Sequence, residues 1–409
     1  MTVISGVFCT GQLDSADGPY LLNASDPGIS ASDWPNFRGA DRNGIYSEDD
    51  FDAGKLSANA VLWKKNIGKG YSAPSIYQDK LFIIGHEEPN DVVRCLNAKT
   101  GKEIWKFKYE TWTDRDYPGP RASPSYSNGK VYTLGRGGDL FCLNADTGKK
   151  IWGLNVESYG AYNTGWNYAG SVLITGDMAV VNAGKYGMAF NSNTGKLVWK
   201  SPEGVGGYAS PVQFSFKGTD YLAIFGETKL FAVELKTGKL WWEVDWHTGC
   251  EVNAGNPLVY GSRIFIATGY GKGCGVFDFS GGKPKKIWTN TNVVSHFHSF
   301  VYWNEKIFAV SGDAGDSRTS SFRCINPADG KVVWEKRLGF AGFILADDKF
   351  ILVNESGKVY IFEASTSSYK EIKSAQFDSG QYWTAPVMSR GLLYIRNTEG
   401  TLTCIDLSD

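Results

Sequence analysis

The chain has 409 residues, and its 42 basic side chains nearly balance its 43 acidic ones, which leaves a net charge of −1. A chain with no block of like charges is not expected to bind nucleic acid or an anionic membrane. Seven cysteines at this length exclude a disulfide scaffold, and no apolar run reaches the roughly 20 residues of a membrane span. The 14% aromatic residues and 49 glycines instead favour an all-β protein with many turns.

The first 50 residues differ in pattern from the rest of the chain. The start, Met1 to Cys9, has neither a basic segment nor an apolar stretch long enough for a secretory signal, so none is expected. The first ~30 residues are rich in Ser, Asp and Gly and are expected to form a mobile tail. The segment from Asp33 through Trp34 to Gly39 is more specific in sequence and is expected to pack on the domain that follows.

From residue 51 onwards, a glycine followed four residues later by a tryptophan recurs along the chain. The clear copies are Gly101 to Trp105, Gly148 to Trp152, Gly195 to Trp199, Gly238 to Trp242 and Gly330 to Trp334. Weaker copies end at Trp288 and near Ile372, and Trp63 opens the series, so that successive tryptophans lie 42 to 47 residues apart. This period is typical of a four-stranded propeller blade.

Each copy contains three further runs with strand character before its tryptophan strand. In the first copy these runs are 73–77, 80–84 and 92–96. Tryptophan strands and three-strand sets both number eight, but the last set, 384–406, has no tryptophan strand after it. We therefore expect the strand around Trp63 to complete the last blade, which would remove free sheet edges at the closure. The prediction is a single, monomeric, eight-bladed β-propeller of antiparallel blades over residues 51–409.

The repeated sequence Asn-Ala-x-Thr-Gly-Lys-x-x-Trp resembles the PQQ-like β-propeller repeats of quinoprotein alcohol dehydrogenases and of the outer-membrane assembly lipoprotein BamB. The opening Trp34-Pro35-Asn36-Phe37-Arg38-Gly39 and the segment Gly269 to Cys274 are similar to bacterial propellers of the same kind. The resemblance covers roughly residues 33–409 and implies a periplasmic or extracellular location. It indicates the fold more strongly than the function, since propellers carry many functions.

The resemblance to the dehydrogenases is incomplete. Those enzymes typically carry two adjacent cysteines against the quinone and are usually longer, whereas this chain has no Cys-Cys pair. No clear Glu, Asn and Asp set matches their calcium site. No cofactor is therefore predicted, and PQQ with calcium or a transition metal is disfavoured.

The propeller topology also predicts where a site lies. In a blade with strands A to D from the channel outwards, the D–A and B–C connections emerge on one face, here called the top face, and strand A lines the channel. Residues in these connections should therefore ring the mouth of the channel and bind a ligand there. They are Tyr71, Arg121, Arg136, Trp166, Asn167, Lys185, Tyr208, Glu227, Glu251, Asn253, Tyr270, Tyr382 and Trp383.

The pair His296 and His298 is the sharpest local feature within this ring. Alternate residues of an extended segment share a side, so both imidazoles are candidates for facing the channel. Two such groups can act as acid and base or hold zinc or copper, and hydrogen-bonded structural histidines are the plainer interpretation. Nearby Tyr270 and Cys274 leave a copper site as a remote alternative, because the ligand set is incomplete.

Four cysteines occupy one repeated strand position and are expected to be core residues: Cys95, Cys142, Cys324 and Cys404. Cys250 and Cys274 break this pattern. Both are expected on the top face of one blade, where a disulfide is a candidate in an oxidising compartment.

Three functions follow, in order of preference. The first is a binding or scaffold propeller that presents its top face to a small polar molecule, a glycan or a protein. The second is an enzyme acting on a small polar or carbohydrate substrate, with His296 or His298 as acid or base or as metal ligands. The third is a PQQ-dependent dehydrogenase, which the missing cysteine pair disfavours.

Overall fold

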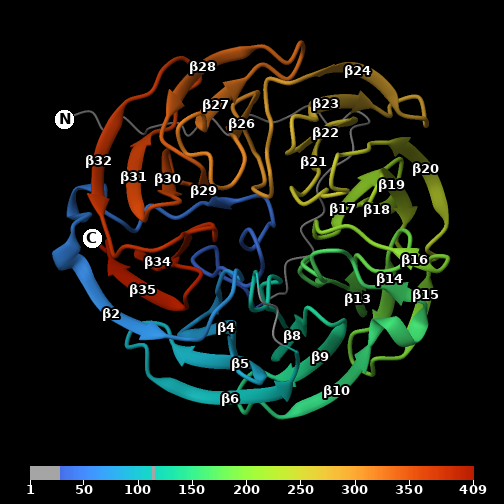
Figure 1. Cartoon of the computed structure of the whole chain (residues 1–409), viewed down its shortest axis with the longest axis horizontal. Coiled ribbons are helices and arrows are strands. Elements are labelled where there is room, and N and C mark those ends of the chain that lie inside the picture. The colour runs from blue at the N-terminus through green and yellow to red at the C-terminus, as the bar shows by residue number, and fades with distance from the viewer. Residues whose placement is uncertain (1–27, 113–115) are drawn as a thin grey trace, which may run out of the picture.

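A computed structural model describes residues 28–112 and 116–409. The predicted mobile tail falls mostly on residues 1–27, outside the described part of the chain. Eight antiparallel blades of four strands form a ring, which Figure 1 shows from one end, and one of these sheets gains a short parallel fifth strand. The predicted eight-bladed all-β propeller is confirmed. Within these ranges, no helix has the length and apolar character that a membrane crossing requires.

Eight blades follow one another around the ring, and within each the strands run from the channel outwards. Their bounds are as follows. Blade 1 has β3 (Ser75–Tyr77), β4 (Lys80–Glu87), β5 (Asn90–Asn97) and β6 (Glu103–Glu110). Blade 2 has β7 (Ser125–Ser127), β8 (Lys130–Leu134), β9 (Asp139–Asn144) and β10 (Lys150–Asn155). Blade 3 has β12 (Leu173–Thr175), β13 (Met178–Val181), β14 (Met188–Asn191) and β15 (Leu197–Lys200). Blade 4 has β17 (Val212–Phe216), β18 (Thr219–Phe225), β19 (Lys229–Glu234) and β20 (Leu240–Asp245).

The second half of the ring repeats this arrangement. Blade 5 has β21 (Leu258–Tyr260), β22 (Arg263–Thr268), β23 (Gly273–Asp278) and β24 (Lys285–Asn290). Blade 6 has β25 (Val301–Trp303), β26 (Lys306–Ser311), β27 (Ser321–Ile325) and β28 (Val332–Arg337). Blade 7 has β29 (Ala341–Ala346), β30 (Lys349–Asn354), β31 (Lys358–Glu363) and β32 (Glu371–Gln376). Blade 8 has β33 (Val387–Ser389), β34 (Leu392–Arg396) and β35 (Thr401–Asp406), and β2 (Val61–Asn66) is its outermost strand.

Closure of the ring follows the prediction. β2 pairs antiparallel with β35, and Trp63 lies opposite Cys404, so the N-terminal strand completes the blade formed by the C-terminal end of the chain. Figure 1 shows the light-blue β2 beside the red β35. The remaining short elements lie outside the four-strand pattern: β1 (Ile45–Tyr46), β11 (Ala161–Tyr162), β16 (Gly204–Val205), and the 3₁₀ turns η1 (Ala53–Lys55), η2 (Ala58–Ala60) and η3 (Val156–Tyr159).

The repeated tryptophans join neighbouring blades. The indole nitrogen of Trp105 donates to the carbonyl oxygen of Ala145 at 2.9 Å, in the blade that follows. A Cβ atom on Gly148 would lie 2.6 Å from the same ring, so only glycine allows the indole to pack this closely. The same indole contact recurs at Trp63, Trp152, Trp199, Trp288 and Trp334. Trp242 is the exception, because its buried indole nitrogen has no partner.

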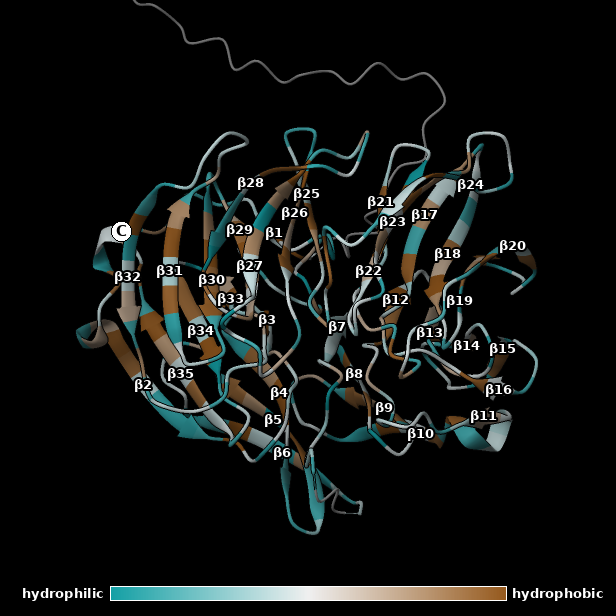
Figure 2. Ribbon diagram, turned by 45° about the horizontal axis from the view of Figure 1, so that its top comes forward, coloured by the Kyte–Doolittle hydropathy of each residue, from teal (hydrophilic) through white to brown (hydrophobic). Residues whose placement is uncertain are grey.

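The outermost strand of every blade contains a β-bulge directly before the tryptophan position. In blade 1, Trp105 lies opposite Cys95 and Glu103 lies opposite Leu96, so Ile104 is the extra residue. The extra residues in the eight blades are Leu62, Ile104, Ile151, Val198, Trp241, Ile287, Val333 and Ile372. Apart from Trp241, all are exposed aliphatic side chains. Figure 2 shows hydrophobic residues within the strands of the blades.

Residues 33–46 lie at the centre of the ring rather than on its outside. Trp34 is 2% exposed and exchanges backbone hydrogen bonds with Ile76 of β3, at 2.9 and 2.7 Å. The carbonyl oxygen of Pro35 accepts from the amide of Tyr126 in β7. β1 pairs parallel with β29. The dark blue trace crosses the middle of Figure 1, so this segment contacts the inner strands of several blades.

Candidate functional site

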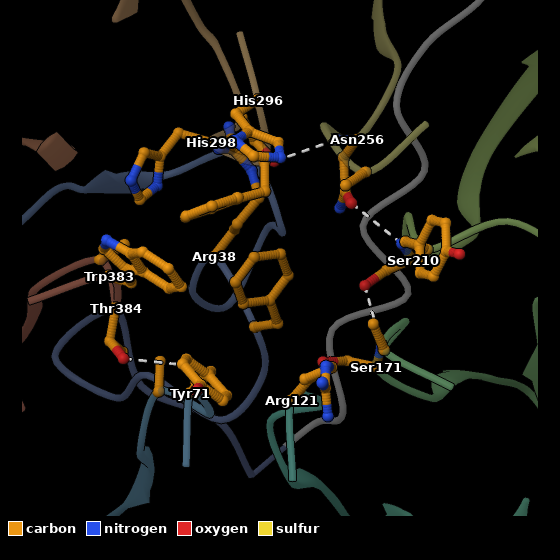
Figure 3. Close-up of a pocket in the computed structure, with 18 of the residues that line it drawn as sticks. Arg38, Tyr71, Arg121, Ser171, Ser210, Asn256, His296, His298, Trp383 and Thr384 are labelled. Atoms are coloured by element: carbon orange, nitrogen blue, oxygen red, sulfur yellow. Dashed lines mark hydrogen bonds between the residues drawn. The ribbon is translucent and has the colours of Figure 1, made fainter. Parts of the chain in front are cut away.

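A cavity of about 300 Å³ lies on the axis of the propeller. Figure 3 shows labelled side chains from the N-terminal segment and from several blades arranged around it. Eight of the residues predicted for the mouth of the channel line this cavity. They are Tyr71, Arg121, Trp166, Tyr208, Tyr270, His296, His298 and Trp383. The inner-strand topology therefore brings together residues that are as far as 312 positions apart in the sequence.

The other predicted residues lie elsewhere. Arg136 is fully buried between blades 1 and 2, where its Nη2 lies 3.1 Å from His86 Nδ1. Asn253 is also fully buried and donates to the carbonyl oxygens of Gly226, Glu227 and Trp246. Tyr382 is in the core of blade 8, and Lys185 and Asn167 do not reach the cavity. Their positions in the loops are as expected, but they are not among the residues that line the cavity.

Two acidic residues from the prediction also lie outside the cavity lining, Glu227 in a B–C turn and Glu251 in a D–A connection. Burial raises the pKa of Glu227, and the neighbouring carboxylate of Glu251 raises it further. Among the described residues that line the cavity, none is a carboxylate. The two kinds of charge are therefore separated, with cations in the cavity and these carboxylates beyond it.

Aromatic rings close the top of the cavity. Trp383 stacks on Tyr71 and on Tyr117, with ring centroids 5.8 Å apart in both pairs. Tyr117 reaches across the mouth from the connection between blades 1 and 2, and its ring also meets Trp166 edge-on at 5.4 Å. The guanidinium group of Arg121 lies 5.5 Å from the centre of the Tyr71 ring. Stacked rings and an adjacent cation favour flat ligands with negative charge.

The N-terminal segment supplies the floor of the cavity through Trp34, Phe37 and Arg38. Arg38 Nη2 donates to the carbonyl oxygens of Asn43, at 2.6 Å, and Phe300, and so ties this segment to blade 6. Burial lowers the pKa of Arg38 to about 9, which leaves the guanidinium charged at neutral pH. The cavity therefore contains a second fixed cation, on the side opposite the top face.

Hydroxyl groups form a belt around the cavity at the level of the inner strands. The amide of Ser123 donates to Ser171 Oγ, the amide of Ser171 to Ser210 Oγ, and the amide of Asn256 to Ser299 Oγ, at 2.9 to 3.1 Å. Dashed lines in Figure 3 mark contacts of this belt. Because each hydroxyl oxygen accepts an amide proton, its own proton is available to a group in the cavity. The belt therefore supplies donors to a ligand.

The two histidines lie in different environments within the cavity wall. His296 Nε2 is 3.0 Å from the hydroxyl of Tyr270, and its Nδ1 accepts from the amide of Ala314 at 3.2 Å. His298 is 6% exposed, and its Nε2 has no hydrogen-bond partner. Burial lowers the pKa of His296 and lowers that of His298 to about 3. Both are neutral at pH 7, and the catalytic role suggested for them stays a prediction.

The ligand set for a metal is incomplete at these histidines. In the described parts of the chain, no three His, Cys, Asp or Glu side chains come together as a metal site. The cavity lining offers nitrogen and hydroxyl groups but no carboxylate for calcium. The residues present therefore do not fit PQQ bound together with calcium.

The predicted disulfide is corrected by the structure, in which Cys250 and Cys274 are free thiols. Cys274 lies in β23 and points into the core between blades, where its sulfur contacts Asn290 Oδ1 at 3.2 Å. Cys250 is exposed in the connection between β20 and β21. The two residues flank the same blade, but the strand alternation turns one inwards while the loop carries the other outwards. Cys95, Cys142, Cys324 and Cys404 are buried, which confirms their assignment as core residues.

Sequence reasoning missed the floor and part of the roof of the cavity. Trp34, Phe37 and Arg38 belong to a distinctive sequence motif. This motif lies outside the repeat, so the blade period does not predict its position in the channel. Tyr117 lies in a predicted D–A connection and could have been found by including every aromatic residue of those loops. The serines of the belt gave no distinctive signal, because serine is common before a strand.

An eight-bladed ring with inter-blade tryptophans and an axial cavity defines the class of PQQ-like β-propellers. The chain belongs to the family described as outer membrane protein assembly factor BamB, whose match covers residues 89–336. No curated protein matched the chain.

Solved structures agree on the fold. BamB from Moraxella catarrhalis is 16% identical with a TM-score of 0.62, and the match covers 85% of this chain and 97% of that one. A quinohemoprotein alcohol dehydrogenase from Comamonas testosteroni is 15% identical with a TM-score of 0.71, covering 93% and 82%. A europium-containing methanol dehydrogenase is 12% identical with a TM-score of 0.64, covering 92% and 89%. At these identities the likeness concerns the fold alone.

Proposed function

We propose that this propeller is a binding protein that holds a small, flat, anionic ligand in its axial cavity. The observation that carries the proposal is the combination of two guanidinium groups, Arg38 and Arg121, with no carboxylate among the described lining residues. In a partly desolvated cavity, such an imbalance of charge favours an anion. The hydroxyl belt adds donors, so the ligand should be rich in acceptor oxygens.

Shape and size limit the ligand further. The walls are built from Tyr71, Trp166 and Trp383, whose faces suit a planar ring. A volume of about 300 Å³ lies at the lower end of the roughly 300–1,000 Å³ found for small-molecule pockets. An aromatic dicarboxylate satisfies both limits. The family name refers to assembly of outer-membrane proteins, which supports a periplasmic or extracellular location for this binding activity.

Isothermal titration calorimetry with isophthalate tests the proposal, with isophthalamide as an uncharged compound of the same shape. We expect the wild-type chain to bind isophthalate and to bind isophthalamide at least tenfold more weakly, because charge-assisted hydrogen bonds are lost. Arg121→Gln should weaken isophthalate binding by about tenfold. Arg263→Gln is the matched control, because this arginine lies away from the cavity beside Asp278. Equal affinity for both compounds would refute the anion preference.

A further inference from the structure

Tyr270 and His296 form a hydrogen-bonded pair in the wall of the axial cavity. Tyr270 Oη lies 3.0 Å from His296 Nε2, and the two rings meet edge-on with centroids 4.8 Å apart. The two residues come from neighbouring connections, Tyr270 from the turn between β22 and β23 and His296 from the connection between β24 and β25. Both line the cavity, so the hydroxyl of Tyr270 lies within reach of a ligand.

The backbone determines which nitrogen of His296 carries the proton. The amide of Ala314 donates to Nδ1 at 3.2 Å, so Nδ1 must be the acceptor nitrogen. In a neutral imidazole the proton is then on Nε2, which donates it to Tyr270 Oη. The hydroxyl of Tyr270 receives this bond and cannot return its own proton to His296. That proton is therefore directed away from the imidazole, and no other described residue accepts it.

The turn that carries Tyr270 is held in one conformation. Tyr270 has a φ of 55°, which is uncommon for an aromatic residue. Its amide donates to Asp313 Oδ1 at 3.1 Å. A Cβ atom on Gly269 would lie 2.5 Å from that same oxygen and 3.0 Å from His296 Cα, so a larger residue would displace this contact between the two loops. The position of the hydroxyl is thus set by contacts from blades 5 and 6 before any ligand binds.

We propose that Tyr270 is a specificity-determining residue that donates its phenolic proton to an oxygen atom of the bound ligand. His296 is the positioning residue, because it occupies the acceptor side of the hydroxyl and leaves only the donor side for the cavity. The inference rests on the proposed binding function and adds a requirement to it. The ligand must carry a carbonyl or carboxylate oxygen at the side of the cavity next to blade 5, and a ligand with only a donor at that place is rejected.

The electrostatic environment supports the same assignment. Burial lowers the pKa of His296 despite the opposing effect of Asp313, so the imidazole is neutral at pH 7. Burial, together with nearby groups that include Asp313, raises the pKa of Tyr270, which keeps the hydroxyl protonated. Both groups therefore remain in the states that the donor role requires.

The first test is nitrogen-15 NMR of the histidines in the full-length wild-type chain at pH 7, assigned with single His→Gln variants. The chain has only 4 histidines, so the assignment is practicable. We expect His296 to be the neutral Nε2–H tautomer. A dominant Nδ1–H tautomer, or a protonated ring, would overturn the proposal. This readout does not depend on any ligand, so it separates failure of the pair from failure of the proposed binding function.

The second test measures isophthalate binding to variants. Tyr270→Phe should bind about tenfold more weakly, because it removes one donor to a charged group and keeps the ring. His296→Phe should cause a similar loss, and the double variant should lose little more, since the two residues act as a unit. His296→Gln can still donate to Tyr270 Oη and should stay within about threefold of wild type. Wild-type affinity of Tyr270→Phe would overturn the proposal, whereas no binding to wild type would refute the proposed function instead.

Discussion

Exposed apolar side chains occur in two regions of this molecule, and the two sets differ in kind. On the outer rim they are mainly aliphatic, and seven of them are the extra residues of β-bulges. In the connections of the top face they are aromatic. The top-face set comprises Trp112, Tyr117, Tyr162, Trp166 and Tyr270. No exposed aliphatic residue of comparable size belongs to the top-face connections among the described residues.

The two sets of exposed side chains have different origins. The rim set repeats with the blade, and its cause is local: the bulge leaves one residue unpaired, so its side chain turns outwards. Each bulge also interrupts an outermost strand whose regular edge would otherwise be open to pairing with another chain. The aromatic set follows no period and has no such cause. Features that repeat with the blade therefore belong to the fold, and features that break the repeat are candidates for binding.

The largest effect is expected at two neighbouring residues of β6, of which one is buried between blades and the other belongs to the exposed rim. Trp105→Ala should lower the free energy of unfolding by about 3–5 kcal/mol, because the buried indole and its bond to blade 2 are lost. Ile104→Ala, one residue earlier and 45% exposed, should change it by less than about 0.5 kcal/mol. Chemical denaturation, followed by far-ultraviolet circular dichroism so that the signal does not depend on tryptophan fluorescence, measures the free energy of unfolding of both variants. Similar losses at the two positions would show that the rim residues are not passive.

His298, in the irregular top-face region, should make stability depend on pH. Its folded pKa of about 3 lies below the ordinary value of 6.5, so the unfolded chain binds the proton first. The stability from this group is complete above pH 6.5 and is lost as the pH falls towards 3. Between pH 7 and 5 the loss should be about 2 kcal/mol, at about 1.4 kcal/mol per pKa unit.

Denaturant unfolding at the two pH values, for the wild type and for His298→Gln, measures this effect. The variant should lose the part of the pH dependence that His298 contributes, while the part from the lowered pKa of His296 remains. His247→Gln is the control, because this histidine is exposed, and it should keep the wild-type profile. A pH dependence in His298→Gln that is as large as in the wild type would place its origin in another group.

Glu355 should affect binding through the orientation of Trp383. Its Oε1 accepts from the indole nitrogen of Trp383 at 2.5 Å and from the amide of Gly315 at 3.0 Å, and so orients the ring that stacks in the cavity roof. Glu355→Ala should weaken isophthalate binding by about fivefold, which corresponds to about 1 kcal/mol. Glu363→Ala removes an exposed carboxylate from the same blade and serves as the control. Isothermal titration calorimetry with isophthalate measures the affinity of both variants.

The smallest effect is expected on the rim. Replacing Ile104 and Ile287 together by threonine should leave isophthalate binding unchanged and alter stability by less than about 0.5 kcal/mol per site. Trp166→Thr in the top face should weaken binding measurably, because the ring lines the cavity. If the rim variant loses affinity instead, the division between repeating and irregular features fails.

Much of the fold could be predicted because the repeat is encoded locally. The spacing from Gly148 to Trp152 indicates a turn followed by an outer strand. The last three-strand set has no outer strand after it, so the sequence also indicates that β2 takes this place. The site could be predicted only in outline. Topology fixes the blade from which a residue such as Arg136 comes, but the direction of its side chain depends on loop conformation, which pairs it with His86 instead of the cavity. The floor around Arg38 depends on a segment with no repeat at all.

The closure of blade 8 has a consequence for the order of events during synthesis. β2 ends at Asn66, and its partner begins at Thr401, so Trp63 leaves the ribosome long before β35 exists. At roughly 5–20 residues per second, the interval is about 20–70 seconds. Throughout that time the first strand has no sheet to join, and each completed blade presents an open side to the solvent. The nascent ring is therefore most exposed to wrong partners just before β35 is made.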